Sequence, residues 1–297
     1  MTLCEASHNV TKSTTCVNLG IGLARQGKKV LIVDNDPQSD CTASLGWHDH
    51  DALDQTLASV MQSIIRDEEF DHYAPILHHS EGVHLVPASI ELAGLEVTLV
   101  NSMTREFVLR DYLSCIKHEY DYVLIDCAPS LGLLTINALA AADSVIVPVQ
   151  AQYLPAKGMT QLMKTIGKVK RQINPNLKID GVLLTLVDGR TKLARQTADT
   201  IRRQYGNVLK IYKTQIPIAV KAAEISAVGQ SIFAYDEGSK VAVAYENLTR
   251  EVLADGARSR AKSTPMLSAK ATPALLIKCK RIPGFVPVKP VTSLVLT

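Results

Sequence analysis

Short, almost wholly apolar runs recur along this 297-residue chain and alternate with segments of helical periodicity. Runs of this kind are typical of strands that are buried on both faces of a parallel sheet. They are VLIVD at 30–34, VHLVPA at 83–88, YVLIDCA at 122–128, SVIVPV at 144–149 and KIDGVLLTLV at 178–187. Helices are expected at about 13–26, 53–66, 89–99, 104–118, 132–141, 157–173 and 192–205. The alternation predicts an α/β fold, a doubly wound and mostly parallel sheet with helices on both faces.

The end of the chain has a different composition from the rest. Residues 257–297 contain eight Lys or Arg, five prolines and no acid, which leaves a charge of about −5 on the preceding residues when the total is +3. This stretch shows no helical period. We therefore expect one domain over 1–256, followed by a basic, proline-containing irregular tail over 257–297.

The cysteines and the apolar segments indicate the compartment. Six cysteines show no CxxC pairing or regular spacing, so they suggest neither a zinc site nor a disulfide framework. The sequence has no uncharged apolar stretch of 18 residues, and its N-terminus lacks the pattern of a signal peptide. These features predict a cytoplasmic protein with no membrane partner.

Polar residues follow several of the predicted strands. In a doubly wound sheet the ligand crevice lies at the carboxyl ends of the strands. Asp34, Asp126 and Pro148 occupy these positions in the runs at 30–34, 122–128 and 144–149. They are therefore expected to converge on one site.

Two kinds of motif at this edge suggest phosphate and metal chemistry. Lys12-Ser13 at the start of a predicted helix places an ammonium near phosphates and a hydroxyl near Mg²⁺. Asp34 and Asp36 point the same way from an extended segment, which suits holding a Mg²⁺ water or polarising an attacking water, and Asp126 at a strand end can bind Mg²⁺ through water. Each motif also fits a simpler interpretation, such as an N-cap serine beside a solvated lysine, or a turn.

Taken in order, these segments resemble the ParA/MinD superfamily of P-loop ATPases, and within it the ParA or Soj proteins that partition chromosomes and plasmids. The resemblance covers about residues 12–255. It rests on VNLGIGLARQGKKVLIVDNDPQ, YDYVLIDCAPSLGLLTINALAAADSVIVPVQ, the turn Asp188-Gly189-Arg190-Thr191, and IPIAVKAAEISAVGQSIFAYD. It implies a P-loop NTPase fold with ATP and Mg²⁺ as cofactors.

The resemblance also implies roles for individual residues. Lys12 would contact the β and γ phosphates, Ser13 would ligate Mg²⁺ and Thr14 would touch the α phosphate, with Val10 and Thr11 completing the loop. Asp36 would position the hydrolytic water, so that Asp36 and Lys12 carry the catalysis. The metal and its waters would be held by Ser13, Asp34 and Asp126, and Pro217 with its neighbours would pack on the adenine.

The phosphate-binding loop departs from the family pattern. The family has Lys-Gly-Gly-Val-Gly-Lys-Ser/Thr, whereas residues 7–13 here read SHNVTKS, without the three glycines and the signature lysine. Glycines let such a loop adopt backbone angles that are costly for other residues and let N–H groups approach the phosphates. The substitutions are expected to weaken the phosphate cradle, and Ser7 replaces a lysine that reaches across the family's dimer. A sequence error or a frameshift scar within residues 1–11, or genuine decay of the loop, would each explain them.

Basic residues gather between positions 185 and 225. A face of this kind can neutralise DNA phosphates without reading sequence, although a solvated helix face has the same composition. The resemblance to partition ATPases favours DNA. The candidate DNA-binding residues are Arg190, Lys192, Arg195, Arg202, Arg203 and Lys221.

The resemblance predicts a function with partners. It implies a weak ATPase whose ATP-bound homodimer binds nonspecific DNA at the nucleoid and is stimulated by a ParB-like centromere-binding protein. The alternative is a catalytically impaired ParA-like binding protein that acts without turnover. A metabolic or cell-division relative is a third interpretation, disfavoured by the Asp188-Gly189-Arg190 and IPIAVKAAE segments.

Overall fold

A single eight-stranded sheet forms the centre of the computed structural model, which describes residues 10–128, 130–151, 156–218, 228–262 and 292–296. The strand order is β2-β3-β1-β4-β8-β5-β6-β7, and each neighbouring pair is parallel except β2 and β3. The strands are β1 (Val30–Asn35), β2 (Leu77–His78), β3 (Val83–Val86), β4 (Tyr122–Cys127), β5 (Ser144–Gln150), β6 (Lys178–Val187), β7 (Ile211–Pro217) and β8 (Thr292–Leu296).

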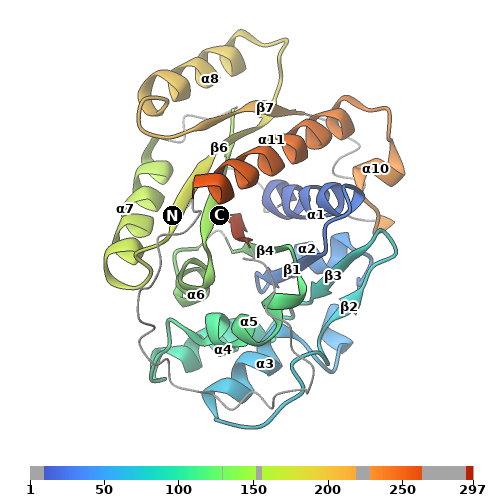
Figure 1. The fold of residues 1–297 in the computed structure, drawn as a ribbon, viewed down its shortest axis with the longest axis vertical. Helices are drawn as coiled ribbons and strands as arrows, with labels where there is room; N and C mark the ends of the chain where they lie inside the picture. The colour runs from blue at the N-terminus through green and yellow to red at the C-terminus, as the bar shows by residue number, and fades with distance from the viewer. Residues whose placement is uncertain (1–9, 129, 152–155, 219–227, 263–291, 297) are drawn as a thin grey trace.

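Helices cover both faces of this sheet (Figure 1). One layer contains α1 (Val10–Arg25), α2 (Asp40–Ser44), α10 (Ile232–Tyr235) and α11 (Lys240–Lys262). The other contains α3 (Leu57–Ile65), α4 (Glu91–Val100), α5 (Val108–Ile116), α6 (Leu133–Ala141), α7 (Ala156–Gln172) and α8 (Lys192–Tyr205). The predicted fold class is confirmed.

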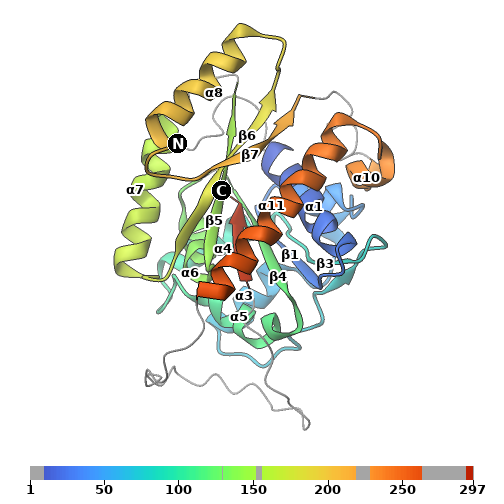
Figure 2. The same cartoon turned by 45° about the horizontal axis from the view of Figure 1, so that its top comes forward.

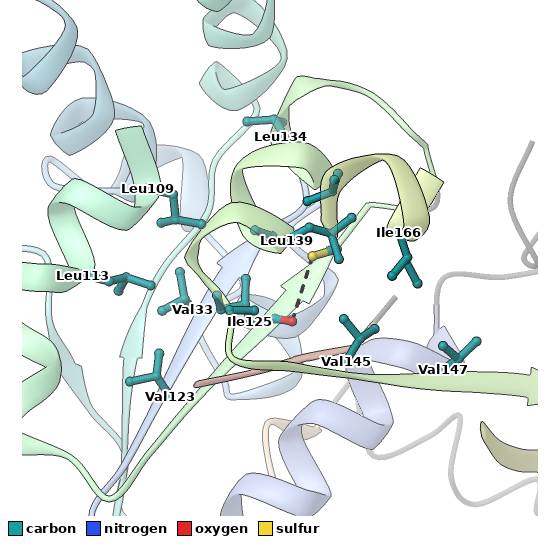
Figure 3. Packing of buried hydrophobic residues seen from close by; sticks show 14 of the residues in the cluster. Val33, Leu109, Leu113, Val123, Ile125, Leu134, Leu139, Val145, Val147 and Ile166 are labelled. Carbon is teal, nitrogen blue, oxygen red and sulfur yellow. Dashed lines mark hydrogen bonds between the residues drawn. The ribbon is translucent and has the colours of Figure 1, made fainter. Parts of the chain in front are cut away.

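The apolar strands are buried on both sides because a layer of helices covers each face of the sheet. Successive side chains along a strand point to opposite faces, so Leu31 and Val33 join one core cluster while Val30 and Ile32 join the other. Figure 3 shows the first cluster, in which side chains of the sheet point toward α5, α6 and α7. The residues labelled there are Val33, Leu109, Leu113, Val123, Ile125, Leu134, Leu139, Val145, Val147 and Ile166.

The C-terminal stretch differs from its expected irregular conformation in two places. Helix α11 continues past residue 256 to Lys262, and Thr292–Leu296 forms β8 in the middle of the sheet. The turned view in Figure 2 shows this strand, in red, beside β4 and β5. Prolines interrupt helices, but the run TSLVL contains none and suits a buried parallel strand. Among the described residues, no helix is long and apolar enough to cross a membrane.

Candidate nucleotide site

The first turn of α1 is attached to the carboxyl end of β4. The Lys12 Nζ donates a hydrogen bond to the carbonyl oxygen of Cys127 at 3.1 Å. The Ser13 hydroxyl donates to Oδ2 of Asp126 at 2.6 Å. Lys12, Ser13 and Asp126 are all buried, so these polar groups are held in place within the protein rather than in solvent.

Two more carboxylates, those of Asp34 and Asp36, lie at and just after the end of β1. Both oxygens of Asp34 are used: Oδ2 accepts from the Thr42 backbone N–H at 2.8 Å and from its hydroxyl at 2.7 Å, and Oδ1 accepts from the Asp36 N–H at 3.2 Å. The Thr42 hydroxyl also accepts from the Ala88 N–H at 3.0 Å. The Asp36 carboxylate accepts from the Gln38 N–H at 3.0 Å.

The register of the sheet places these acids side by side. Asp34 and Asp126 are paired positions on the adjacent parallel strands β1 and β4. Burial raises the pKa of Asp34 to about 7, against the lowering effect of its Thr42 hydrogen bonds. Burial and the neighbouring Asp34 raise the pKa of Asp126 well above its ordinary value. A cation bound beside two buried acids would stabilise their ionised forms, because it neutralises their negative charge.

Unpaired polar atoms concentrate at the same place. Within the described ranges, six buried side-chain N or O atoms lack a hydrogen-bond partner, and four of them belong to residues of this cluster or directly beside it: Thr14 Oγ1, Asn35 Oδ1, Ser39 Oγ and Asp126 Oδ1. A buried polar atom without a partner costs about 1–3 kcal/mol. The arrangement therefore fits a polar ligand that would supply partners to these atoms.

The donor set fits Mg²⁺ on a nucleotide better than a metal held by protein side chains. In the described part of the chain, no group of three His, Cys, Asp or Glu side chains is placed to hold an ion. Mg²⁺ usually keeps several waters and binds through one or two carboxylates together with substrate phosphates. A hydroxyl, nearby acids and a buried ammonium are suited to that mode.

The structure brings together six of the residues that the sequence predicted for nucleotide, metal and catalysis. They are Lys12, Ser13, Thr14, Asp34, Asp36 and Asp126. Val10 and Thr11 lie in the first turn of α1, where the structure describes their backbone but not their side chains. Residues 7–9 of the divergent loop lie outside the described residues.

Pro217, predicted to contact the base, lies apart from this cluster. It ends β7, four strand positions from β4, which is about 19 Å at the usual spacing. There it lines a cavity of about 850 Å³, which none of the six clustered residues lines. Other residues around the cavity are Val187, Asp188, Arg190, Lys213 and Asn247.

Sequence reasoning missed Thr42, which makes two hydrogen bonds to Asp34. Thr42 follows Asp34 by eight residues, in the short helix α2. The motif DNDPQ ends before it, and no local pattern indicates that the helix turns back onto the strand.

Known proteins resemble this chain over most of its length. Residues 5–179 match the family model described as an AAA domain. The chain is 41% identical over 247 residues to the sporulation initiation inhibitor protein Soj of Bacillus subtilis, which covers 83% of this chain and 95% of the relative. It is 40% identical over 246 residues to the chromosome partitioning protein ParA of Myxococcus xanthus, covering 82% and 84%. The chain belongs to the ParA/Soj family of partition ATPases.

Solved structures share the fold of this chain. The structure of a protein described as cobyrinic acid a,c-diamide synthase from Mycobacterium smegmatis, with bound ADP and magnesium, matches with a TM-score of 0.75 and 34% identity over 88% of this chain and 94% of that one. The septum site-determining protein MinD from Pyrococcus horikoshii, complexed with Mg-ADP, shares the fold with a TM-score of 0.63 at 23% identity, covering 83% and 92%. Structural relatives thus hold the nucleotide and metal predicted for the ParA/Soj fold.

The basic residues predicted for DNA contact lie on and beside α8. Arg190 pairs with Asp188 at 3.0 Å, and Arg202 with Asp199 at 3.3 Å. Arg195 donates to the Gly189 carbonyl at 2.8 and 2.6 Å. Lys192, Arg195, Arg202 and Arg203 are exposed, as is Arg190, whereas Lys221 lies outside the described residues.

The buried acids predict a pH dependence of stability. Because its native pKa is raised from 3.8 to about 7, Asp34 keeps a proton in the folded state that the unfolded chain releases. Without nucleotide or Mg²⁺, the free energy of unfolding should therefore fall as pH rises from about 4 to about 7. Urea unfolding at stepped pH should show this slope, and Asp34→Asn should reduce it. Asp54→Asn, at an exposed position, should leave the slope unchanged.

Proposed function

We propose that this chain is an ATP-dependent DNA partition protein, a weak ATPase that binds Mg²⁺-ATP, forms a homodimer and binds nonspecific DNA. The observation that supports this most directly is the buried cluster of Lys12, Ser13, Asp34 and Asp126 with its unpaired oxygens, in a chain of the ParA/Soj family. We expect it to act in the cytoplasm at the nucleoid, with a ParB-like protein stimulating hydrolysis.

Each residue of the cluster has a role in this proposal. Lys12 would exchange its hydrogen bond to the Cys127 carbonyl for the β and γ phosphates, whose charged oxygens accept stronger hydrogen bonds from an ammonium. Ser13 would ligate Mg²⁺ through its hydroxyl oxygen, while the hydroxyl goes on donating its hydrogen bond to Asp126. When bound, Mg²⁺ neutralises charge on the transferred phosphoryl group. Asp34 would hold waters of the metal, and Val10, Thr11 and Thr14 would line the phosphates.

Asp36 would orient the attacking water. Burial raises the pKa of its carboxyl, while nearby Lys12 lowers it. A carboxylate with a raised pKa beside a lysine is suited to accept a proton from water. The family resemblance assigns the adenine to Pro217, which lines a cavity that shares no residue with the phosphate cluster.

A second candidate is a ParA-like binding protein without turnover. The specific observation in its favour is the SHNVTKS loop, in which no glycine precedes Lys12. Such a protein would keep the scaffold and a DNA-binding face. It would bind DNA with or without nucleotide.

Nucleotide binding and hydrolysis distinguish the two candidates. Calorimetry should detect Mg²⁺-ATP binding, and phosphate release should exceed that of Lys12→Ala when DNA and partner are present. Lys117→Ala, which removes an exposed lysine, is the matched control and should hydrolyse ATP as the unsubstituted chain does. A rate equal to that of Lys12→Ala would exclude turnover, and a nucleotide-independent gel shift would favour the second candidate.

DNA binding through α8 has its own test. Arg195→Ala and Arg202→Ala should each weaken binding to random duplex DNA and reduce the slope of log K against log salt by about 1. The exposed Arg66, which directly follows α3, provides the control Arg66→Ala, for which the slope should not change. Equal slopes for all three variants would assign α8 to a solvated face instead.

A further inference from the structure

The position between β4 and β5 in the middle of the sheet, here called the slot, is filled by β8, a strand from the C-terminal part of the chain. β8 pairs in parallel with β4 on one side, from Tyr122↔Thr292 to Asp126↔Leu296. It pairs in parallel with β5 on the other side, from Ser144↔Leu294 to Ile146↔Leu296. In sequence, however, β4 and β5 follow one another and are joined through α6. The strand between them is therefore not part of their local connection.

Removing this strand would leave a gap between β4 and β5. Two strand spacings, or about 9.5 Å, separate the backbones of β4 and β5 across β8. The residues of β4 are buried throughout, as are the first six of β5. Backbone groups that now pair with β8 would thus be exposed to an empty interior, and unpaired buried backbone groups are rare in proteins. The slot therefore requires an extended segment.

The side chain of Leu294 adds specificity to the backbone pairing. It is 1% exposed and belongs to the core cluster on the α1 and α11 side of the sheet. Tyr122 and Leu124 of β4 and Ile146 of β5 belong to the same cluster. The slot thus accepts a parallel strand with a large apolar residue at the position of Leu294.

We propose that the slot between β4 and β5 is a strand-binding site, and that residues 292–296 of this chain occupy it as a separable ligand. Recognition is by strand addition, in which backbone hydrogen bonds supply affinity and a buried side chain supplies specificity. Between the end of α11 at Lys262 and Thr292 lie 29 residues, so the strand is joined to the rest of the fold only through that connection. The slot adjoins the proposed nucleotide site at one end, where Leu296 pairs with Asp126, but strand binding does not depend on nucleotide binding.

Cleavage of the full chain tests whether the strand is separable. A protease recognition sequence is inserted between residues 270 and 271, and the cleaved protein is passed through a gel-filtration column. The C-terminal piece should co-elute with the body. A fluorescent peptide of residues 288–297 should bind the cleaved protein in its place, and the Leu294→Asp peptide should compete roughly 30-fold more weakly. The Leu294→Val peptide should compete within a few-fold.

Elution of the piece apart from a folded body would overturn the proposal, as would equal competition by the wild-type and Leu294→Asp peptides. Hydrogen exchange on the uncleaved chain provides a second measurement. The amides of 293–296 should be protected, and an excess of isotopically heavy 288–297 peptide should reduce that protection by displacing the tethered strand. Fast exchange in the chain by itself, or protection that the peptide leaves unchanged, would also contradict the proposal.

Discussion

Asp36→Asn is expected to bind Mg²⁺-ATP about as well as the unsubstituted chain and to hydrolyse it at least ~100-fold more slowly. The substitution removes the group that would orient and deprotonate water. It retains an oxygen that accepts from the Gln38 N–H, so the turn after β1 should persist. Because Asp36 is buried with a raised pKa, loss of its charge should not destabilise the fold.

The measurement for Asp36→Asn combines phosphate release with equilibrium binding of a fluorescent ATP analogue. Asp54→Ala, which changes an exposed aspartate, is the control and should leave both quantities unchanged. If Asp36→Asn hydrolyses ATP at the rate of the unsubstituted chain, Asp36 does not orient the water. If both variants bind no nucleotide, the site itself is assigned wrongly.

Gly229→Ala should lower the free energy of unfolding by about 2–4 kcal/mol. Gly229 has a φ of +68°, and a Cβ there would lie 2.5 Å from Cα of Gly46 and 2.9 Å from its nitrogen. Gly46 also has a positive φ, of +96°, so two glycines allow the backbones to approach at this point. Backbone atoms cannot move aside as the end of a flexible side chain can. The substitution therefore combines a strained conformation with a steric clash.

Urea unfolding followed by circular dichroism would measure this loss. Gly238→Ala is the matched control, because no heavy atom lies within 4 Å of the added Cβ and its φ is not positive. It should change stability by less than about 0.5 kcal/mol. Equal effects of the two substitutions would show that the contact between Gly229 and Gly46 does not limit packing.

The sequence predicted the parts of the site that depend on buried parallel strands. The runs at 30–34 and 122–128 end in Asp34 and Asp126, and the carboxyl ends of adjacent parallel strands lie at one edge of a sheet. Lys12 and Ser13 lie in the first turn of α1, the helix that packs beside those strands, so the same pattern places them at this edge. Their meeting is therefore a consequence of the strand pattern.

Contacts between distant segments could not be predicted in this way. Thr292–Leu296 was expected to be irregular, because its neighbours in sequence are prolines and its pairing partners lie more than 140 residues away. The tie between Thr42 and Asp34 depends on how α2 folds back, which apolar periodicity does not encode. The separation of Pro217 from the phosphate cluster follows from the strand order, and β8 itself widens that separation by one strand.

One hydroxyl group joins the acidic cluster to a more distant part of the molecule. Thr42 donates to Asp34 and accepts from the backbone of Ala88, just after β3 and shortly before α4. If the Asp34 carboxylate rotated toward a cation, it would lose its hydrogen bond from the Thr42 hydroxyl. That hydroxyl also accepts from the Ala88 N–H, at the start of the segment between β3 and α4. Binding of a cation beside Asp34 is therefore expected to change the hydrogen bonding of the segment between β3 and α4 as well.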